Sequence, residues 1–197
     1  MQDSLPNNSQ SALESVKSLL TIKTNELKEI KIQRGRAFGA GDHATTKAAL
    51  LLMEETLLTS PINYQSFLDV GCGTGIFAIW ASKFGFQQII ATDIDDDAIE
   101  ASQYNRSLNQ VYFEIHQNPT PPAGSYDVIV ANILPPALNL LFPSIKERLS
   151  DHGIFFIAGF NDSNFQEIKT EWIKAGFVDF CTRNERGWIA VALKHKN

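Results

Sequence analysis

The chain has 197 residues, of which 44% are hydrophobic and 20% charged, and its formal net charge is −5 at pH 7. This length suits one domain with a short additional segment, and the balance of apolar and charged residues excludes a disordered chain. The acidic balance provides no global positive field for nucleic acid phosphates, so structured RNA is a less favoured substrate.

The cysteines and the start of the sequence bear on the cellular compartment. Cys72 and Cys181 lie far apart without the spacing of metal ligands, and a disulfide at Cys72 would be awkward because it lies within a glycine-rich segment. No run approaches the roughly 20 apolar residues that span a bilayer. The first ten residues also lack a basic stretch followed by an apolar one. These features predict a cytoplasmic protein without a membrane segment.

The first 35 residues are expected to form an N-terminal appendage. Ser11 and Glu14 have the spacing of a capping box, and apolar residues from Leu13 to Leu20 recur at helical spacing, which predicts a short helix. Alternating residues at 29–33 predict a strand. A loop with three glycines then leads into a predicted helix at 44–58, so the main domain is expected at 36–197.

From residue 66 onward the predicted strands and helices alternate. Strands are expected at 67–70, 88–92, 111–115, 127–131 and 154–158, and helices at 76–84, 96–108, 136–149 and 164–175. This rhythm is typical of a parallel sheet with helices on both faces. Two last strands, at 177–182 and 188–193, have no helix between them and are expected to form a hairpin. We therefore predict an α/β, Rossmann-like sheet of seven strands, mostly parallel with a C-terminal antiparallel hairpin, which is the methyltransferase arrangement.

The strongest local signal is the run F-L-D-V-G-C-G-T-G at 67–75, an apolar strand that leads directly into a glycine-rich turn. Glycine there lets a ligand approach the backbone. The spacing is G-x-G-x-G, which differs from the dinucleotide fingerprint that holds a pyrophosphate. S-adenosylmethionine has no pyrophosphate, and its ammonium and carboxylate suit the loop's backbone donors and an adjacent aspartate. The candidate contacts are Asp69, Gly71, Cys72 and Gly73; the alternative is a tight turn without a ligand.

A second acidic position, Asp93, ends the next predicted strand about 20 residues later, where a carboxylate can accept hydrogen bonds from both hydroxyls of a ribose. Ile94 beside it is a further candidate contact. The acids at 95–97 are better explained as the cap and first turn of the following helix. The alternative for Asp93 is an acid that only terminates its strand.

Asn132 ends the apolar run at 126–131, at the carboxyl edge of the predicted sheet where ligands bind in open α/β folds. Its amide oxygen can orient an amine toward the sulfonium methyl without the full negative charge that would hold a proton on that amine. We therefore predict Asn132 as the catalytic residue of a transfer to nitrogen. The alternative is a residue that only terminates the strand.

Four segments resemble the PrmA family, the bacterial methyltransferases of a large-subunit ribosomal protein. They read A-F-G-A-G-D-H-A-T-T at 37–46, D-V-G-C-G-T-G-I at 69–76, D-I-D at 93–95 and A-N-I-L at 131–134. The first is the most specific, because F-G-x-G-x-H-x-T-T is close to a family signature. The resemblance extends from about residue 29 to the C-terminus.

The resemblance implies contacts to S-adenosylmethionine, a loop that closes over the site and a protein amine, a lysine or an N-terminal amine, as the acceptor. The implied contacts are Thr46, Gly71, Asp93 and Asn132, and the implied loop is that of Phe38. Two small departures are Ala40, where the family has threonine, and R-G at 34–35, where it has P-G. The family also carries an N-terminal domain that recognises the ribosomal protein, for which 35 residues are too few. We therefore expect a catalytic domain alone.

Other interpretations remain open from the sequence. His43 is either a proton-transfer group or a cap and brace of its loop. The four histidines show neither a nucleophilic triad nor metal-ligand spacing, so no metal is expected. One rival function is a methyltransferase of a nucleic acid base or a small amine, because N-I-L-P loosely resembles the N-P-P-[YF] of such enzymes. Another is a domain that binds S-adenosylmethionine without catalysis.

Overall fold

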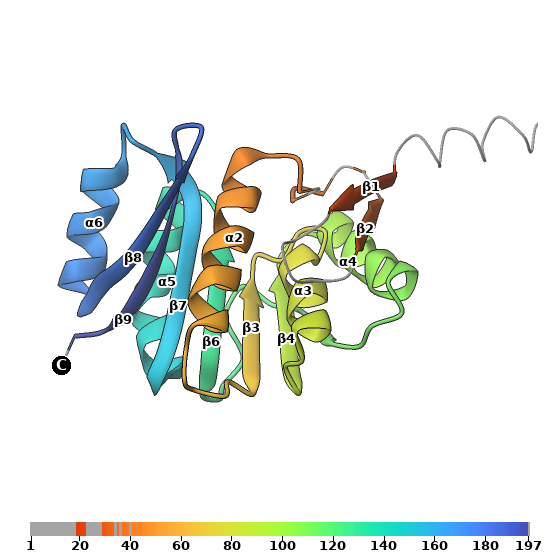
Figure 1. Cartoon of the computed structure of the whole chain (residues 1–197), viewed down its shortest axis with the longest axis horizontal. Helices are drawn as coiled ribbons and strands as arrows, with labels where there is room; N and C mark the ends of the chain where they lie inside the picture. The colour runs from red at the N-terminus through yellow and green to blue at the C-terminus, as the bar shows by residue number, and fades with distance from the viewer. Residues whose placement is uncertain (1–18, 23–28, 34, 36, 40, 197) are drawn as a thin grey trace, which may run out of the picture.

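A seven-stranded sheet forms the middle layer in the computed structural model, which describes residues 19–22, 29–33, 35, 37–39 and 41–196 (Figure 1). Its strands are β3 (Ser66–Val70), β4 (Gln88–Asp93), β5 (Glu114–Gln117), β6 (Tyr126–Asn132), β7 (Leu149–Asn161), β8 (Phe177–Glu185) and β9 (Trp188–His195). Their order across the sheet is β5-β4-β3-β6-β7-β9-β8. In this order the first five strands, β5, β4, β3, β6 and β7, are parallel, and β9 is antiparallel to its neighbours β7 and β8. The predicted fold class is therefore confirmed.

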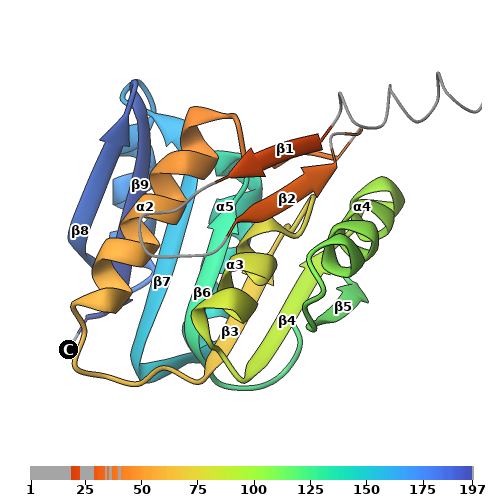
Figure 2. The ribbon, with the colours of Figure 1, turned by 45° about the vertical axis from the view of Figure 1, so that its right-hand side comes forward.

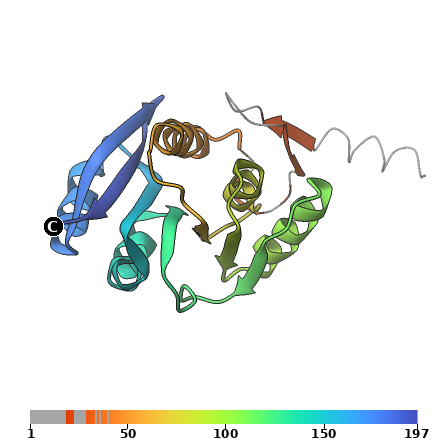
Figure 3. The same cartoon turned by 60° about the horizontal axis from the view of Figure 1, so that its bottom comes forward.

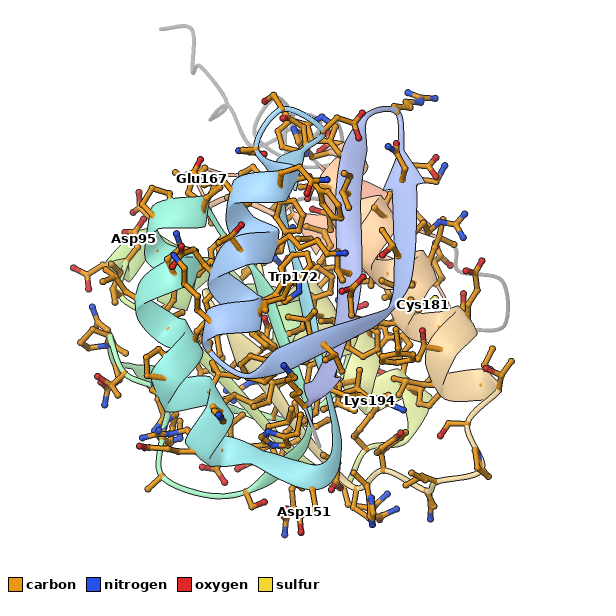
Figure 4. The ribbon with its side chains drawn as sticks, turned by 90° about the vertical axis from the view of Figure 1, so that its left-hand side faces the viewer. Asp95, Asp151, Glu167, Trp172, Cys181 and Lys194 are labelled. Atoms are coloured by element: carbon orange, nitrogen blue, oxygen red, sulfur yellow. The ribbon has the colours of Figure 1, made fainter. Side chains whose placement is uncertain are left out.

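Helices cover both faces of this sheet (Figure 3). They are α2 (Ala44–Leu58), α3 (Ile76–Phe84), α4 (Asp96–Leu108), α5 (Pro135–Arg148) and α6 (Phe165–Lys174). One buried core joins α2 and α3 to Phe67 and Val128, and a second joins α5 and α6 to Leu68 and Ile129. Adjacent residues of a strand face opposite sides of a sheet. The central strands therefore bury apolar side chains on both faces, and Trp172 of α6 is buried in the second core (Figure 4).

A separate two-stranded sheet of β1 (Leu19–Ile22) and β2 (Ile30–Gln33) lies beside α3 and α4 (Figure 2). The strand predicted at 29–33 is confirmed, and Ile30 and Ile32 are fully buried in the core of α2 and α3. The predicted N-terminal helix is wrong for residues 19 and 20, because they pair with β2 in an antiparallel ladder. The rest of that predicted helix, with its capping box, lies outside the described residues.

Several element boundaries differ from the prediction for identifiable reasons. The helices α2, α3 and α4 have the predicted bounds. The strand predicted at 111–115 begins only at Glu114, because Phe113 is buried in the core and its carbonyl accepts a hydrogen bond from the Arg106 guanidinium at 2.7 Å. β7 is longer than predicted and includes the polar residues Asp151 and His152, which are exposed. Sequence pattern alone favours only its apolar centre.

Both cysteines are free: Cys72 is buried and Cys181 is exposed on β8 (Figure 4). Within the described residues, no group of three or more His, Cys, Asp or Glu side chains is placed to hold a metal ion. None of the helices in that part of the chain is long and apolar enough to cross a membrane.

Candidate active site

The carboxyl ends of β4, β3 and β6 meet at one edge of the sheet (Figure 1). β3 lies between the other two strands, with Val70 level with Thr92 of β4 and Ala131 of β6. The chain leaves β3 to build the sheet first on one side and then on the other, so this edge is a topological switch point. Ligands of open α/β sheets bind at such points. The glycine loop, Asp93 and Asn132 are therefore brought together at this edge.

The glycine loop after β3 has a backbone that only glycine adopts easily. Gly71, Gly73 and Gly75 have φ angles of 69°, 51° and 77°. The Gly71 and Cys72 N–H groups both donate to the Thr92 carbonyl, at 2.8 and 2.9 Å. These two N–H groups are already used inside the protein. A ligand at this loop would therefore contact the glycine backbone by packing against it, rather than through the N–H donors that the sequence suggested.

Asp93 holds the shape of this edge through three hydrogen bonds. Its Oδ2 accepts from the Gly73 N–H at 2.9 Å, and its Oδ1 accepts from the N–H groups of Ile94 at 2.7 Å and Asp95 at 3.1 Å. Oδ1 uses both of its lone pairs in these bonds, whereas Oδ2 keeps one lone pair. Ile94 is 69% exposed beside it, while Asp95 caps α4 by accepting from the Asp97 N–H. The carboxylate is thus fixed in place with capacity to bind another donor.

Asp69 does not face the open edge of the site. Its side chain is fully buried, Oδ2 accepts from the Ala78 N–H of α3 at 3.1 Å, and Oδ1 has no partner among the described residues. Burial raises the pKa of this carboxyl to about 8, and the nearby negative charge of Asp93 contributes to the rise. Burial likewise raises the pKa of the Cys72 thiol, with Asp69 and Asp93 contributing. Both groups are therefore neutral at pH 7.

Asn132 is held at both ends of its amide by the first turn of α2. Its Oδ1 accepts from the Thr45 hydroxyl at 3.0 Å, and its Nδ2 donates to the Thr46 hydroxyl at 3.2 Å. Thr45 in turn accepts from the Gly159 N–H at 2.8 Å. Sequence reasoning missed Thr45, although its place two residues after the helix cap was a signal. The amide orientation is thereby set before any ligand arrives.

Aromatic side chains gather at the start of α2. His43 caps the helix, since its Nδ1 accepts from the Thr45 N–H at 3.3 Å. Its ring centroid lies 5.7 Å from that of Phe38 and 4.5 Å from that of Trp188 at the start of β9. The structure therefore favours the capping and bracing role for His43. Sequence reasoning missed Trp188, because only the fold brings β9 to this position.

The burial of Asp69 generates a prediction about stability and pH. Its pKa is about 8 in the folded protein against an ordinary 3.8, so the folded chain holds a proton that the unfolded chain releases. The stability due to this group is complete below pH 3.8 and is lost as the pH rises to 8. Between pH 5 and 8, we expect the wild type to lose about 3 to 4 kcal/mol more unfolding free energy than Asp69→Asn.

Urea unfolding at several pH values measures this difference. Asp151→Asn, at an exposed position of β7, is the control and should follow the wild type. Parallel pH curves for the wild type and Asp69→Asn would show that Asp69 is ionised in the folded protein.

The comparisons with known proteins agree on one family. The chain matches the family model described as "Ribosomal protein L11 methyltransferase (PrmA)" over residues 14–196. Curated proteins of that name from Lactobacillus helveticus and Caldanaerobacter subterraneus are 35% and 34% identical over 170 residues. Each alignment covers 85% of this chain and 53% of the relative, so the chain spans about half the length of these relatives.

Solved structures show the same similarity. A ribosomal protein L11 methylase from Lactobacillus delbrueckii subsp. bulgaricus superposes with a TM-score of 0.76 at 30% identity, over 84% of each chain. An S-adenosylmethionine-dependent methyltransferase from Clostridium acetobutylicum gives a TM-score of 0.66 at 11% identity, over 80% of this chain and 94% of that one, which shows a shared fold alone. The chain therefore belongs to the ribosomal protein L11 methyltransferase (PrmA) family.

Proposed function

We propose that the protein is an S-adenosylmethionine-dependent N-methyltransferase that acts on an amine of a protein. The observation that carries this proposal is the meeting of Asp93, the glycine loop and the fixed amide of Asn132 at one edge of the sheet. Family membership supports the same reading.

In this proposal the cofactor lies across the ends of β3 and β4. Asp93 would accept a hydrogen bond from the ribose through the spare lone pair of Oδ2, and the exposed side chain of Ile94 would be covered by the adenine ring. The methionyl part would lie against the backbone of Gly71 and Gly73, whose own side-chain space is occupied by Ile133 and by the Phe38 carbonyl. Thr46 accepts from Asn132, so its own hydroxyl hydrogen can donate to the methionyl carboxylate. Asp69 would not contact the cofactor; its buried side chain accepts a hydrogen bond from Ala78 of α3 and so holds the start of the glycine loop against that helix.

The acceptor amine must be neutral when it attacks the sulfonium methyl. A lysine with a pKa of ~10.4 is neutral in only about one molecule in 2,500 at pH 7, a handicap of roughly 4 to 5 kcal/mol. The cofactor supplies the methyl on a good leaving group, so the protein's task is alignment and removal of water. Asn132 Oδ1 uses one lone pair on Thr45 and can accept an amine N–H with the other. The rings of Phe38, His43 and Trp188, which gather at the start of α2, would keep water from the amine when a substrate covers them, and loss of water disfavours an ammonium.

The relatives are named for a ribosomal protein, and we propose a substrate of that class, with a lysine or N-terminal amine as the acceptor. Such a substrate places the reaction in the cytoplasm. We assign the chemistry to residues 36–197 and regard residues 1–35 as an appendage. Because Ile30 and Ile32 are buried in the main core, this boundary divides functions rather than hydrophobic cores.

Methyl transfer from labelled S-adenosylmethionine tests the function directly. We expect label in a protein when the enzyme is incubated with ribosomal proteins, transfer RNA, ribosomal RNA and small amines in parallel. Label confined to nucleic acid or to small amines would replace the proposed acceptor class. Cofactor binding without transfer to any amine would identify a non-catalytic binding domain.

Substitution of Asp93 tests the ribose contact. Asp93→Ala should weaken S-adenosylmethionine binding by about 1.5 to 3 kcal/mol, the scale of a hydrogen bond to a charged group. Asp96→Ala, an exposed acid three positions along, is the control and should bind normally. Calorimetry measures both affinities, and unchanged affinity in folded Asp93→Ala would remove this carboxylate from the site.

Substitution of Asn132 separates alignment from binding. Asn132→Ala should lower the rate of methyl transfer more than the affinity for the cofactor, because the amide also orients the acceptor amine. Asn63→Ala, at an exposed position between α2 and β3, serves as the control. Single-turnover kinetics combined with calorimetry measures the two effects. Equal losses in both would make Asn132 a cofactor ligand only.

A further inference from the structure

Two asparagines, Asn105 of α4 and Asn109 at its C-cap, bind the edge of β2 that does not face β1. Asn109 accepts from the Lys31 N–H at 2.9 Å and donates to the Lys31 carbonyl at 2.7 Å. Asn105, one helical turn earlier, accepts from the Gln33 N–H at 2.8 Å. The side-chain amides thus replace a neighbouring strand, since each offers the donor and acceptor of a peptide group. β2 is thereby fixed on α4 through its backbone.

Asn105 makes one bond that Asn109 does not make. Its Nδ2 donates to the Thr74 carbonyl of the glycine loop at 3.0 Å, and its side chain is fully buried. One amide therefore joins β2, α4 and the glycine loop. A cavity of about 410 Å³ lies beside it between the end of β2 and α4, lined in part by Gln33 and Tyr104. These hydrogen bonds add to the attachment that the buried side chains of Ile30 and Ile32 already give β2.

Thr74 extends this connection to the loop of Phe38. Its N–H donates to the Phe38 carbonyl at 3.0 Å and its hydroxyl donates to the Gly39 carbonyl at 2.6 Å. Together with the bond from Asn105, every polar group of this buried residue is used. A Cβ added to Gly73 would lie 2.2 Å from the Phe38 oxygen, so the two loops are in direct contact.

We propose that Asn105 is a positioning residue for the methyl-transfer reaction, an inference that rests on the proposed function. It touches neither cofactor nor acceptor. It holds the Thr74 carbonyl, and Thr74 follows the Gly73 whose N–H binds Asp93. Loss of the Asn105 amide leaves the buried Thr74 carbonyl without this donor, which favours a shift of the glycine loop. Asp93, which binds Gly73, and the Phe38 loop, which binds Thr74, would then both be less firmly held.

Asn109 provides a matched control for this proposal. It caps the C-terminus of the same helix, bonds the same strand edge and makes no hydrogen bond to the glycine loop among the described residues. If Asn105 acted only by fastening β2, removal of Asn109 would have the same consequence. If it acts through Thr74, the two variants differ in cofactor binding.

The experiment compares Asn105→Ala, Asn105→Asp and Asn109→Ala in the full chain, by calorimetry with S-adenosylmethionine. Asn105→Asp is measured at a pH above the pKa of its buried carboxyl, where it keeps an acceptor for Gln33 and lacks a donor for Thr74. We expect both Asn105 variants to bind about tenfold more weakly than the wild type, and Asn109→Ala within about twofold. Thr74→Val, which removes the hydroxyl bond to Gly39, should also bind more weakly and supplies a second variant should Asn105→Ala not fold. Normal affinity in folded Asn105→Asp, or an equal loss in Asn109→Ala, overturns the proposal.

Amide hydrogen exchange separates this inference from the proposed function. The N–H groups of Gly73 and Thr74 should exchange faster in the Asn105 variants and at the wild-type rate in Asn109→Ala, with no cofactor present. If the wild type itself fails to bind S-adenosylmethionine, the proposed function fails, and the exchange rates still decide whether Asn105 holds the loop. Unchanged protection in the Asn105 variants contradicts the inference.

Discussion

The Phe38 carbonyl oxygen occupies the space where a side chain at position 73 would begin, 2.2 Å from an added Cβ. Two loops that are far apart in the sequence can therefore meet only if that position is glycine. Thr74 then bonds the second loop through its N–H and its hydroxyl. The other groups at the carboxyl edge of the sheet depend on this contact. Gly73 also binds Asp93, and the Phe38 loop leads into His43, the cap of α2. A change at the contact would move groups on both sides of the site.

The polar groups at this edge are oriented before a ligand arrives. Asn132 is held by Thr45 and Thr46, and Asp93 is held by Gly73 and by the backbone that follows it. Groups fixed in this way need little reorganisation when charge moves during a reaction. Three hydrogen-bonding groups remain available to a ligand, namely the Thr46 hydroxyl hydrogen and one spare lone pair each on Asn132 and Asp93. These groups suit a ligand that has both hydrogen-bond donors and an anionic group.

The sequence predicts what is local and misses what depends on distant pairing. Helices α2 to α4 and the glycine loop follow from periodicity and glycine spacing within short segments. The roles of Thr45, Asn105 and Trp188 depend on partners 87, 72 and 145 positions away in the chain, respectively Asn132, Gln33 and His43. The burial of Asp69 also escapes a sequence pattern, because the same acid after an apolar strand could equally face the open edge. Whether the candidate contacts bind the cofactor is a matter for the experiments on Asp93 and Asn132.

The C-terminal hairpin links the fold class to the site. β8 and β9 extend the sheet beyond β7, and the turn between them places Trp188 level with Asn161 of β7 and against His43. Salt bridges from Lys47 to Glu185 and from Arg183 to Glu55 fasten α2 to the hairpin. Exposed ion pairs of this kind add little stability singly, but these two act at opposite ends of one helix. The first turn of that helix holds Asn132, so the antiparallel ending of the sheet supports the amide at its centre.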